Sequence, residues 1–403
     1  MPITPSWGSV LDSFSDNQTK ETASDLIDVA KRSSLSYREI ADLAIRLAKS
    51  GTILGDVAAG PIFDVPSTGG PGSLSTLLIP LILAATARKV LKLTVPGRPA
   101  GGIDCLAQLD GYRIEPEIGD LKNWAKVGLY VHILANERFA PLDAFLFDFR
   151  KASGNLAIPS LVTASILSKK IAMGITDVAL DIRISNFGNF GTTWEEARSN
   201  ATHFNGVAQA LGMKSRCFLS NGYYPQQPFF GRGESLVALR KIFDDADCRH
   251  LKAHLDNCYA MALSMIGPAD VVPEISRQAL QTEFAANLTL QGSSFETFVS
   301  LTERIAAAHV NTIEAPAAGL LTIDLERMRD AIVSVQKRQA NVRFSDPCGI
   351  VLQANPFEYL KKGDIICTYR YSGDDRQAFE TELSGCFGFS SNIDRPYDLE
   401  EII

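Results

Sequence analysis

The sequence lacks the patterns that mark metal-binding, disulfide-rich and nucleic-acid-binding proteins. Its 403 residues include seven cysteines and five histidines, and no two cysteines have the C-x-x-C spacing of a zinc ribbon or a thioredoxin-like site. An odd number of scattered cysteines favours reduced thiols over a disulfide framework. No basic cluster offers a face to a phosphate backbone, and the formal net charge of -7 argues against nucleic acid as a partner.

Segments suited to export or membrane insertion are also missing. The first residues lack the basic and apolar regions of a signal peptide. The longest apolar run, LSTLLIPLILAATA, is shorter than a membrane span and contains Pro80, so we expect a buried helix there. These absences predict a cytoplasmic protein with no membrane partner, no nucleic-acid partner and no metal.

What the sequence does contain is an alternation of helix and strand patterns. Residues 36–51 begin with a capping-box pair, Ser36 and Glu39, and carry apolar residues at helical spacing. The first twenty residues are polar and aperiodic, which predicts a loose arm. Segments rich in β-branched residues at 89–95 and 177–185 predict buried strands, and we expect a further strand at 214–220. Strands that alternate with helices predict an α/β fold with a largely parallel sheet.

The order of these patterns predicts three parts. We expect a small discontinuous all-α domain from residues 1–55 and 140–175, and a larger α/β domain with a mixed or parallel sheet from residues 56–139 and 176–335. Short strand patterns separated by Pro and Gly turns predict a β-rich C-terminal subdomain over residues 336–403. This organisation places a cleft between the helical domain and the sheet.

The loop DVPSTGGPGSLST, residues 64–76, is the first candidate for a binding site. Its glycines allow backbone N–H groups to approach an anion, and the helix that follows adds positive potential at its N-terminus. The loop contains neither Lys nor Arg, and no G-K-[ST] follows, so it is not a P-loop. A tight turn between two packed elements is the competing interpretation.

A second candidate lies in TASILSKK, where Ser165 and Lys169 are four residues apart. This spacing puts both side chains on one face of a helix, while Lys170 points elsewhere. The pair suits a nucleophile with its base, or two hydrogen-bonding groups for a polar ligand. A solvated helix end is the structural alternative.

Taken together, these motifs resemble those of the thymidine/pyrimidine nucleoside phosphorylases. SGTIL, STGG, the Gly-Arg loop with AGG, TASILSKK and the strand DVALDIR occur in that family's order and spacing, over most of the chain. The anthranilate phosphoribosyltransferases share the broad architecture, but the Ser–Lys helix and the C-terminal unit favour the nucleoside phosphorylases.

The resemblance implies that Arg150, Ser165 and Lys169 bind the pyrimidine base. Arg150 lies fifteen positions before Ser165, as in the family. Arg150 and Lys169 are also the implied catalytic residues, since two cations can stabilise the negative charge that the leaving base gains.

For the phosphate, the resemblance and the loop glycines imply six ligands: Ser67, Gly69, Gly70, Thr76, Thr94 and Arg98. The family's Lys-His pair before Ser-Thr-Gly-Gly is replaced here by Val65 and Pro66. Loss of that Lys removes a charge-assisted hydrogen bond of about 1.5–3 kcal/mol.

The activity implied is phosphorolysis of a pyrimidine nucleoside or deoxynucleoside to base and sugar 1-phosphate, by a homodimer with inorganic phosphate as co-substrate and no cofactor. Two alternatives stay open. One is an enzyme with the same base site and another acceptor, a nucleoside hydrolase or a transferase. The other is a non-catalytic nucleoside-binding protein.

Overall fold

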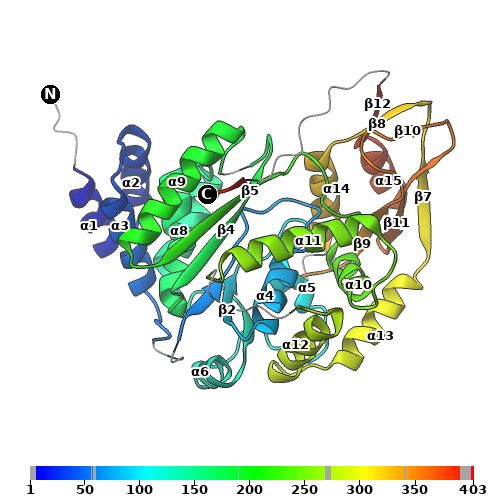
Figure 1. Cartoon of the computed structure of the whole chain (residues 1–403). Helices are drawn as coiled ribbons and strands as arrows, with labels where there is room; N and C mark the ends of the chain where they lie inside the picture. Colours follow the sequence, from blue (N-terminus) through cyan, green and yellow to red (C-terminus); the bar gives the residue numbers. More distant parts are fainter. Residues whose placement is uncertain are drawn as a thin grey trace.

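The computed structural model of the chain describes residues 6–55, 57, 60–188, 190–267, 274–339, 342–390 and 401–403. Within these residues the fold is mixed α/β, which confirms the predicted fold class. One end of the molecule is helical, a six-stranded sheet lies in the middle, and two antiparallel sheets lie at the opposite end (Figure 1).

Four helices of the helical end begin at a side-chain N-cap, which is Ser6, Thr19, Ser36 or Thr193. Ser36 and Glu39 form the predicted capping box, and the apolar residues of the helix that follows are buried. The predicted loose arm at the N-terminus is wrong, because Ser6 caps a first helix whose Trp7, Leu11 and Phe14 side chains are buried. This end comprises α1 (Trp7–Asp16), α2 (Lys20–Arg32), α3 (Tyr37–Lys49), α7 (Pro141–Ala152), α8 (Pro159–Met173) and α9 (Trp194–Ala210).

The central sheet has the strand order β13-β5-β4-β1-β2-β3. Five of its strands are parallel, and only the C-terminal β13 pairs antiparallel, with β5. Chain connections run in opposite directions from β1, so the boundary between β1 and β4 is a topological switch point, where open α/β sheets bind ligands. The strands are β1 (Ile62–Asp64), β2 (Lys89–Thr94), β3 (Tyr130–Leu134), β4 (Asp177–Ile184), β5 (Lys214–Asn221) and β13 (Glu401–Ile402).

The apolar run around Pro80 forms a buried helix, as predicted. This helix is α4 (Ser75–Ala85), and α11 and α12 pack against it. The remaining helices beside the sheet are α5 (Gly102–Leu106), α6 (Ile118–Val127), α10 (Arg232–Phe243), α11 (Arg249–Ser264), α12 (Arg277–Leu290) and α13 (Phe295–Ala306).

The far end holds two antiparallel sheets, with the orders β6-β9-β11-β7 and β10-β8-β12. Strands from both sides of residue 336, the predicted start of the C-terminal subdomain, pair with each other in these sheets. The elements are β6 (Phe229–Phe230), β7 (Val310–Glu314), β8 (Gly319–Ile323), α14 (Leu325–Arg338), β9 (Cys348–Leu352), β10 (Tyr359–Leu360), β11 (Ile365–Tyr371), α15 (Arg376–Ser384) and β12 (Phe387–Ser390).

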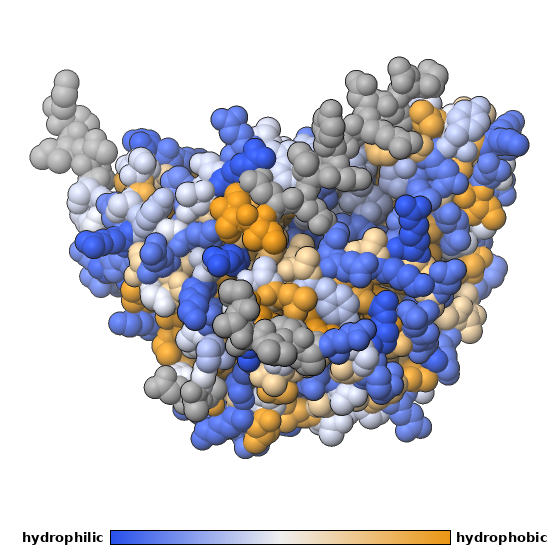
Figure 2. All heavy atoms as spheres, viewed as in Figure 1, coloured by the Kyte–Doolittle hydropathy of each residue, from blue (hydrophilic) through white to orange (hydrophobic). Residues whose placement is uncertain are grey.

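Hydrophilic side chains cover most of the face shown in Figure 2, with smaller apolar areas between them. No described helix is both long and apolar enough to cross a membrane. The seven cysteines all lie among the described residues; they form no disulfide, and six of them are buried.

Candidate functional site

The glycine-rich loop lies at the carboxyl edge of the sheet, at the switch point between β1 and β4. The Thr68 amide donates to the Asp181 carbonyl at 2.9 Å, and the Asp181 amide donates to the Pro66 carbonyl at 2.9 Å. Ser67 forms an isolated parallel bridge with Asp181. The loop therefore continues the pairing of β1 with β4, which fixes its path over the end of the sheet.

The turn itself depends on glycine. Gly69, Gly70 and Gly72 have φ values of 92°, 122° and 78°, a region that residues with a Cβ rarely adopt. Ser67 Oγ accepts a hydrogen bond from the Gly69 amide at 3.2 Å. Ser67 thus closes the turn on itself in this conformation, an arrangement consistent with the tight-turn interpretation.

The N-terminus of α4 is capped from within the protein. The Leu74 amide donates to His254 Nε2 at 2.8 Å, and the Ser75 amide donates to Ser73 Oγ at 3.0 Å. Burial, with the nearby Arg183 charge, lowers the pKa of His254 to about 3, so its imidazole is neutral and accepts at Nε2. An anion at this helix end competes with an internal cap.

A cation missed by the sequence analysis lies beneath the loop. Arg183 Nη1 is 3.5 Å from the Gly70 carbonyl oxygen, and Nη2 donates to Gln226 Oε1 at 2.9 Å. Its Nε is 3.6 Å from Asp181 Oδ2, and both side chains are buried. Burial lowers the pKa of Arg183, with the Asp181 carboxylate opposing that shift.

Three buried polar atoms around this point have no hydrogen-bond partner among the described residues. They are Asp181 Oδ1, Arg183 Nε and His254 Nδ1. Unpaired buried polar atoms are rare in native proteins, since each costs the desolvation of its group. These atoms therefore mark the core beside the glycine-rich loop as polar and incompletely hydrogen-bonded.

A buried Lys–Asp–Lys group links the sheet to the helical end. Asp64, the last residue of β1, accepts from Lys92 Nζ at 2.8 Å and forms a second ion pair with Lys170 of α8. Lys92 also donates to the Val65 carbonyl at 2.6 Å. Burial opposes ionisation of Asp64, but the two ammonium groups outweigh it and lower the pKa of this carboxyl.

Two predicted phosphate ligands, Thr76 and Thr94, gather around His132. Thr94 Oγ1 lies 2.7 Å from His132 Nε2, and Tyr130 Oη lies 2.8 Å from Nδ1. A Cβ built on Gly102 would lie 2.5 Å from His132 Cε1 and 3.2 Å from Thr76 Oγ1. Burial, with the Lys92 charge, keeps the pKa of His132 well below its ordinary value. The imidazole is therefore neutral, and it lies between the hydroxyl groups of Thr94 and Tyr130.

Arg98, the remaining predicted phosphate ligand, lines a hollow of about 200 Å³ together with Arg232 and Lys337. None of the other five predicted phosphate ligands lines this hollow. Arg98 therefore lies beside residues of α10 and α14.

Ser165 and Lys169 lie together, as their spacing predicts. Lys169 Nζ is 3.3 Å from Ser165 Oγ and donates to the Ser165 carbonyl at 3.0 Å. It also forms an ion pair with Asp143, a buried residue in the first turn of α7. Lys170 forms an ion pair with Asp64 of β1 instead. The two adjacent lysines of α8 therefore contact different elements.

Arg150 is buried and bonded to backbone. Its guanidinium donates to the carbonyls of Asn155, Leu156 and Leu161, at 3.2, 2.6 and 3.3 Å. Burial lowers its pKa to about 10, with the Asp143 charge opposing that shift. Asp143 thus acts on both predicted catalytic cations, and it brings the three predicted base-binding residues into one neighbourhood.

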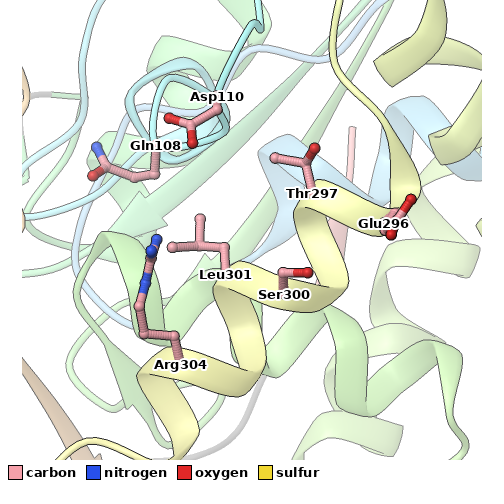
Figure 3. Close-up of a pocket in the computed structure, with 7 residues that line it drawn as sticks. All are labelled: Gln108, Asp110, Glu296, Thr297, Ser300, Leu301 and Arg304. Atoms are coloured by element: carbon pink, nitrogen blue, oxygen red, sulfur yellow. The ribbon is translucent and has the colours of Figure 1, made fainter.

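A different hollow, of about 290 Å³, contains none of the predicted residues (Figure 3). Glu296, Thr297, Ser300, Leu301 and Arg304 line it along α13, with Gln108 and Asp110 on the other side. Its two carboxylates and lone guanidinium offer no charge complement to a phosphate or a nucleobase anion.

Five functional residues are not among those predicted from sequence motifs: Asp64, Lys92, His132, Asp143 and Arg183. A signal for two of them is present: Lys92 and Arg183 interrupt apolar strand patterns that read as buried. A charge in a buried strand requires a partner, and the two partners, Asp64 and Asp181, lie on the adjacent strands β1 and β4.

The fold and the site define an α/β protein with a polar edge at a switch point, facing a helical end that carries a Ser–Lys pair. Among curated proteins, the chain is similar to thymidine phosphorylases. The chain is 28% identical to a thymidine phosphorylase of Colwellia psychrerythraea over 218 residues, which cover 53% of this chain and 48% of that protein.

Thymidine phosphorylases of Burkholderia lata and Burkholderia cenocepacia are each 29% identical over 193 residues, covering 46% of this chain and 44% of those proteins. The chain spans about half the length of the curated relatives it matches. No family model matches it. Over about half of its length the chain is thus similar, at 28–29% identity, to thymidine phosphorylases.

Proposed function

We propose that the chain is a pyrimidine nucleoside phosphorylase-like glycosyltransferase. A phosphate oxygen forms a bond to C1′ of a pyrimidine nucleoside while the bond from C1′ to the base nitrogen breaks. The electron pair of that bond leaves with the base, and the products are the base, after it takes up a proton, and a sugar 1-phosphate. Inorganic phosphate is the co-substrate, and no cofactor is invoked.

The observation that carries this proposal is the geometry on α8. Ser165 Oγ and Lys169 Nζ lie 3.3 Å apart on one helix face, and Asp143 holds the ammonium group by an ion pair. In this role Lys169 donates to a carbonyl oxygen of the base, and Ser165 bonds the ring edge. The charge that develops on the leaving base then meets a fixed cation.

Arg150 has a more constrained part in the proposal. A guanidinium has five N–H groups, and three nitrogens of Arg150 already donate to backbone carbonyls. Direct contact with the base uses the remaining N–H groups, while the existing bonds hold the turn between α7 and α8. Arg150 therefore contributes to binding and to the placement of Ser165.

On the anion side, the proposed ligands are Ser67, Thr76, Thr94 and the amides of Gly69 and Gly70. Arg183 beneath the loop and Lys92 beneath Val65 supply positive charge from within the core. Electrostatic interactions in a buried site are screened less than at the surface. Arg98, proposed from the resemblance, lines the hollow beside α14 instead.

The test is to incubate the full chain with thymidine and with uridine, with and without phosphate, and to separate the products. Base and sugar 1-phosphate are expected only when phosphate is present. Release of base without phosphate would make the protein a hydrolase, and no release at all would refute phosphorolysis of these substrates.

A matched pair of variants assigns the activity to α8. Lys169→Met removes the proposed base ligand, and we expect turnover to fall about 100-fold. Lys151→Met removes an exposed lysine of the adjacent helix α7 and is expected to leave turnover unchanged. Equal activity in the two variants would contradict the role of Lys169.

We further propose a cytoplasmic homodimer formed through the helical end. Size-exclusion chromatography with light scattering measures its mass, and a monomer at micromolar concentration would refute this part of the proposal.

A further inference from the structure

The hollow lined by Arg98 carries three cationic side chains and lies outside the proposed phosphorolysis site. Its volume is about 200 Å³, and nine residues line it: Gly97, Arg98, Arg232, Val333, Gln336, Lys337, Val342, Phe344 and Ser345. Three of the lining residues are cations and none is an acid. They come from the 96–101 loop, the start of α10, the end of α14 and the segment that follows.

Two of the cations are uncompensated within the part of the chain that the structure describes. Arg98 and Lys337 are exposed, and no described carboxylate pairs with either. The two acids behind the hollow are already engaged: Asp104 pairs with Arg232 at 2.8 Å, and Asp346 pairs with Arg370 at 2.6 Å. The hollow therefore presents about two positive charges to an incoming group.

The third cation is buried and rigidly held. The Arg232 side chain is only 8% exposed, its Nε donates to Asp104 Oδ2, and its Nη1 donates to the Ser345 carbonyl. Within the described residues its Nη2 has no hydrogen-bond acceptor. A fixed guanidinium with N–H groups left over is the side chain best suited to an oxyanion.

The loop that carries Arg98 is also fixed in place. Asp104 Oδ1 accepts from the amides of Gly97 and Gly101 at 3.0 and 2.9 Å. Gln336 Nε2 donates to the Pro99 carbonyl at 3.0 Å from the other side. Asp104 thus orders the loop with one oxygen and Arg232 with the other, which preorganises both before any ligand arrives.

We propose that this hollow is a second anion site, which binds a phosphate dianion or a small phosphate monoester. Two uncompensated cations match the charge of a phosphate dianion, and the buried Arg232 supplies directional N–H groups. A volume of about 200 Å³ lies below the range of pockets for drug-sized ligands, so a compact oxyanion fits better than a whole nucleotide. The site does not depend on the phosphorolysis proposed above.

The test is equilibrium dialysis of the full chain with labelled inorganic phosphate at low ionic strength. The double variant Arg98→Gln/Lys337→Gln removes the two exposed cations, and we expect phosphate binding at this site to weaken about tenfold or more. The control Lys31→Gln/Arg38→Gln removes one exposed lysine and one exposed arginine from α2 and α3. It carries the same change in net charge and is expected to bind phosphate like the unmodified protein.

Ser67→Ala distinguishes this site from the proposed catalytic one. The second site is supported if the Arg98/Lys337 variant loses one equivalent of bound phosphate that persists in Ser67→Ala and in the control. It is overturned if the Arg98/Lys337 variant binds as the unmodified protein does, or if that protein binds no phosphate. Absence of phosphorolysis with this binding pattern intact refutes the proposed function alone.

Competition identifies the source of the anion. Displacement of labelled phosphate by ribose 5-phosphate shows that the hollow takes the phosphate of a monoester. Retention of the label at a hundredfold excess of ribose 5-phosphate assigns the site to inorganic phosphate.

Discussion

The buried Lys–Asp–Lys group gives the most direct test of the electrostatics of the core. Asp64, Lys92 and Lys170 are at most 2% exposed, and the group holds two ammonium charges for one carboxylate. Asp64→Asn leaves two buried cations with no anion between them. Because a buried charge that loses its partner typically costs 3–5 kcal/mol, we expect the free energy of unfolding to fall by about 3–5 kcal/mol.

Lys170→Met is the informative comparison, because it removes the excess cation. Asp64 and Lys92 then remain as a neutral pair with a 2.8 Å contact, and the methionine side chain fills a similar volume. One carboxylate oxygen loses its partner, so the expected cost is about 1–2 kcal/mol.

The assay is urea unfolding followed by circular dichroism at pH 7 for the unmodified chain and both variants. Asp64→Asn is expected to be less stable than Lys170→Met by about 2 kcal/mol. Since the pKa of Asp64 lies below its ordinary value of 3.8, its contribution is complete above that pH and is lost as the pH falls through the native value. A cost below about 1 kcal/mol for Asp64→Asn, or a larger cost for Lys170→Met, would refute this reasoning.

Three further predictions concern other buried groups. Because the pKa of His254 is about 3 in the folded chain and its ordinary value is 6.5, the unfolded chain binds the extra proton between these pH values. The free energy of unfolding should therefore fall with decreasing pH below 6.5, and this residue contributes about 1.4 kcal/mol per pH unit. His254→Gln should reduce the slope of the free energy of unfolding against pH, measured with urea, by that amount. Arg150→Lys cannot reach the same three backbone carbonyls and should cost about 2 kcal/mol or more; an unchanged thermal midpoint would contradict this. Gly349→Ala places a Cβ 1.6 Å from Glu234 Oε2 and should lower the thermal midpoint, whereas Gly119→Ala, with nothing within 4 Å, should leave it unchanged or raise it.

The elements with strong local signals were predictable. The capping box at Ser36, the apolar run around Pro80 and the β-branched strands all depend on residues close together in sequence. The Ser165–Lys169 pair was also predictable, because helical spacing alone brings the two side chains together. The first helix was missed although Trp7, Leu11 and Phe14 have helical spacing, since polar residues dominate the composition around them.

The partners of the site residues were not predictable in the same way. Asp143 reaches Lys169, and Asp64 reaches Lys170, only through the packing of α7, α8 and β1. The bonds of Arg150 depend on the path of the turn after α7, which no local pattern specifies. For such residues sequence fixes the chemical type of the side chain, and the fold decides which group it meets.

The net charge near the glycine-rich loop depends on side chains that the fold brings there from other elements. Val65 stands where the resemblance to the nucleoside phosphorylases implies a Lys, and Lys92 donates to the carbonyl of Val65 itself at 2.6 Å. Around the loop, Lys92, Lys170 and Arg183 face the carboxylates of Asp64 and Asp181, which leaves three positive and two negative charges, a net +1. One net charge only half-compensates a phosphate dianion. If phosphate binds at Ser67, its affinity should therefore depend strongly on Lys170, the cation in excess, and a Lys170→Met variant with unchanged KM for phosphate would show that the loop hydroxyls and amides alone hold the anion.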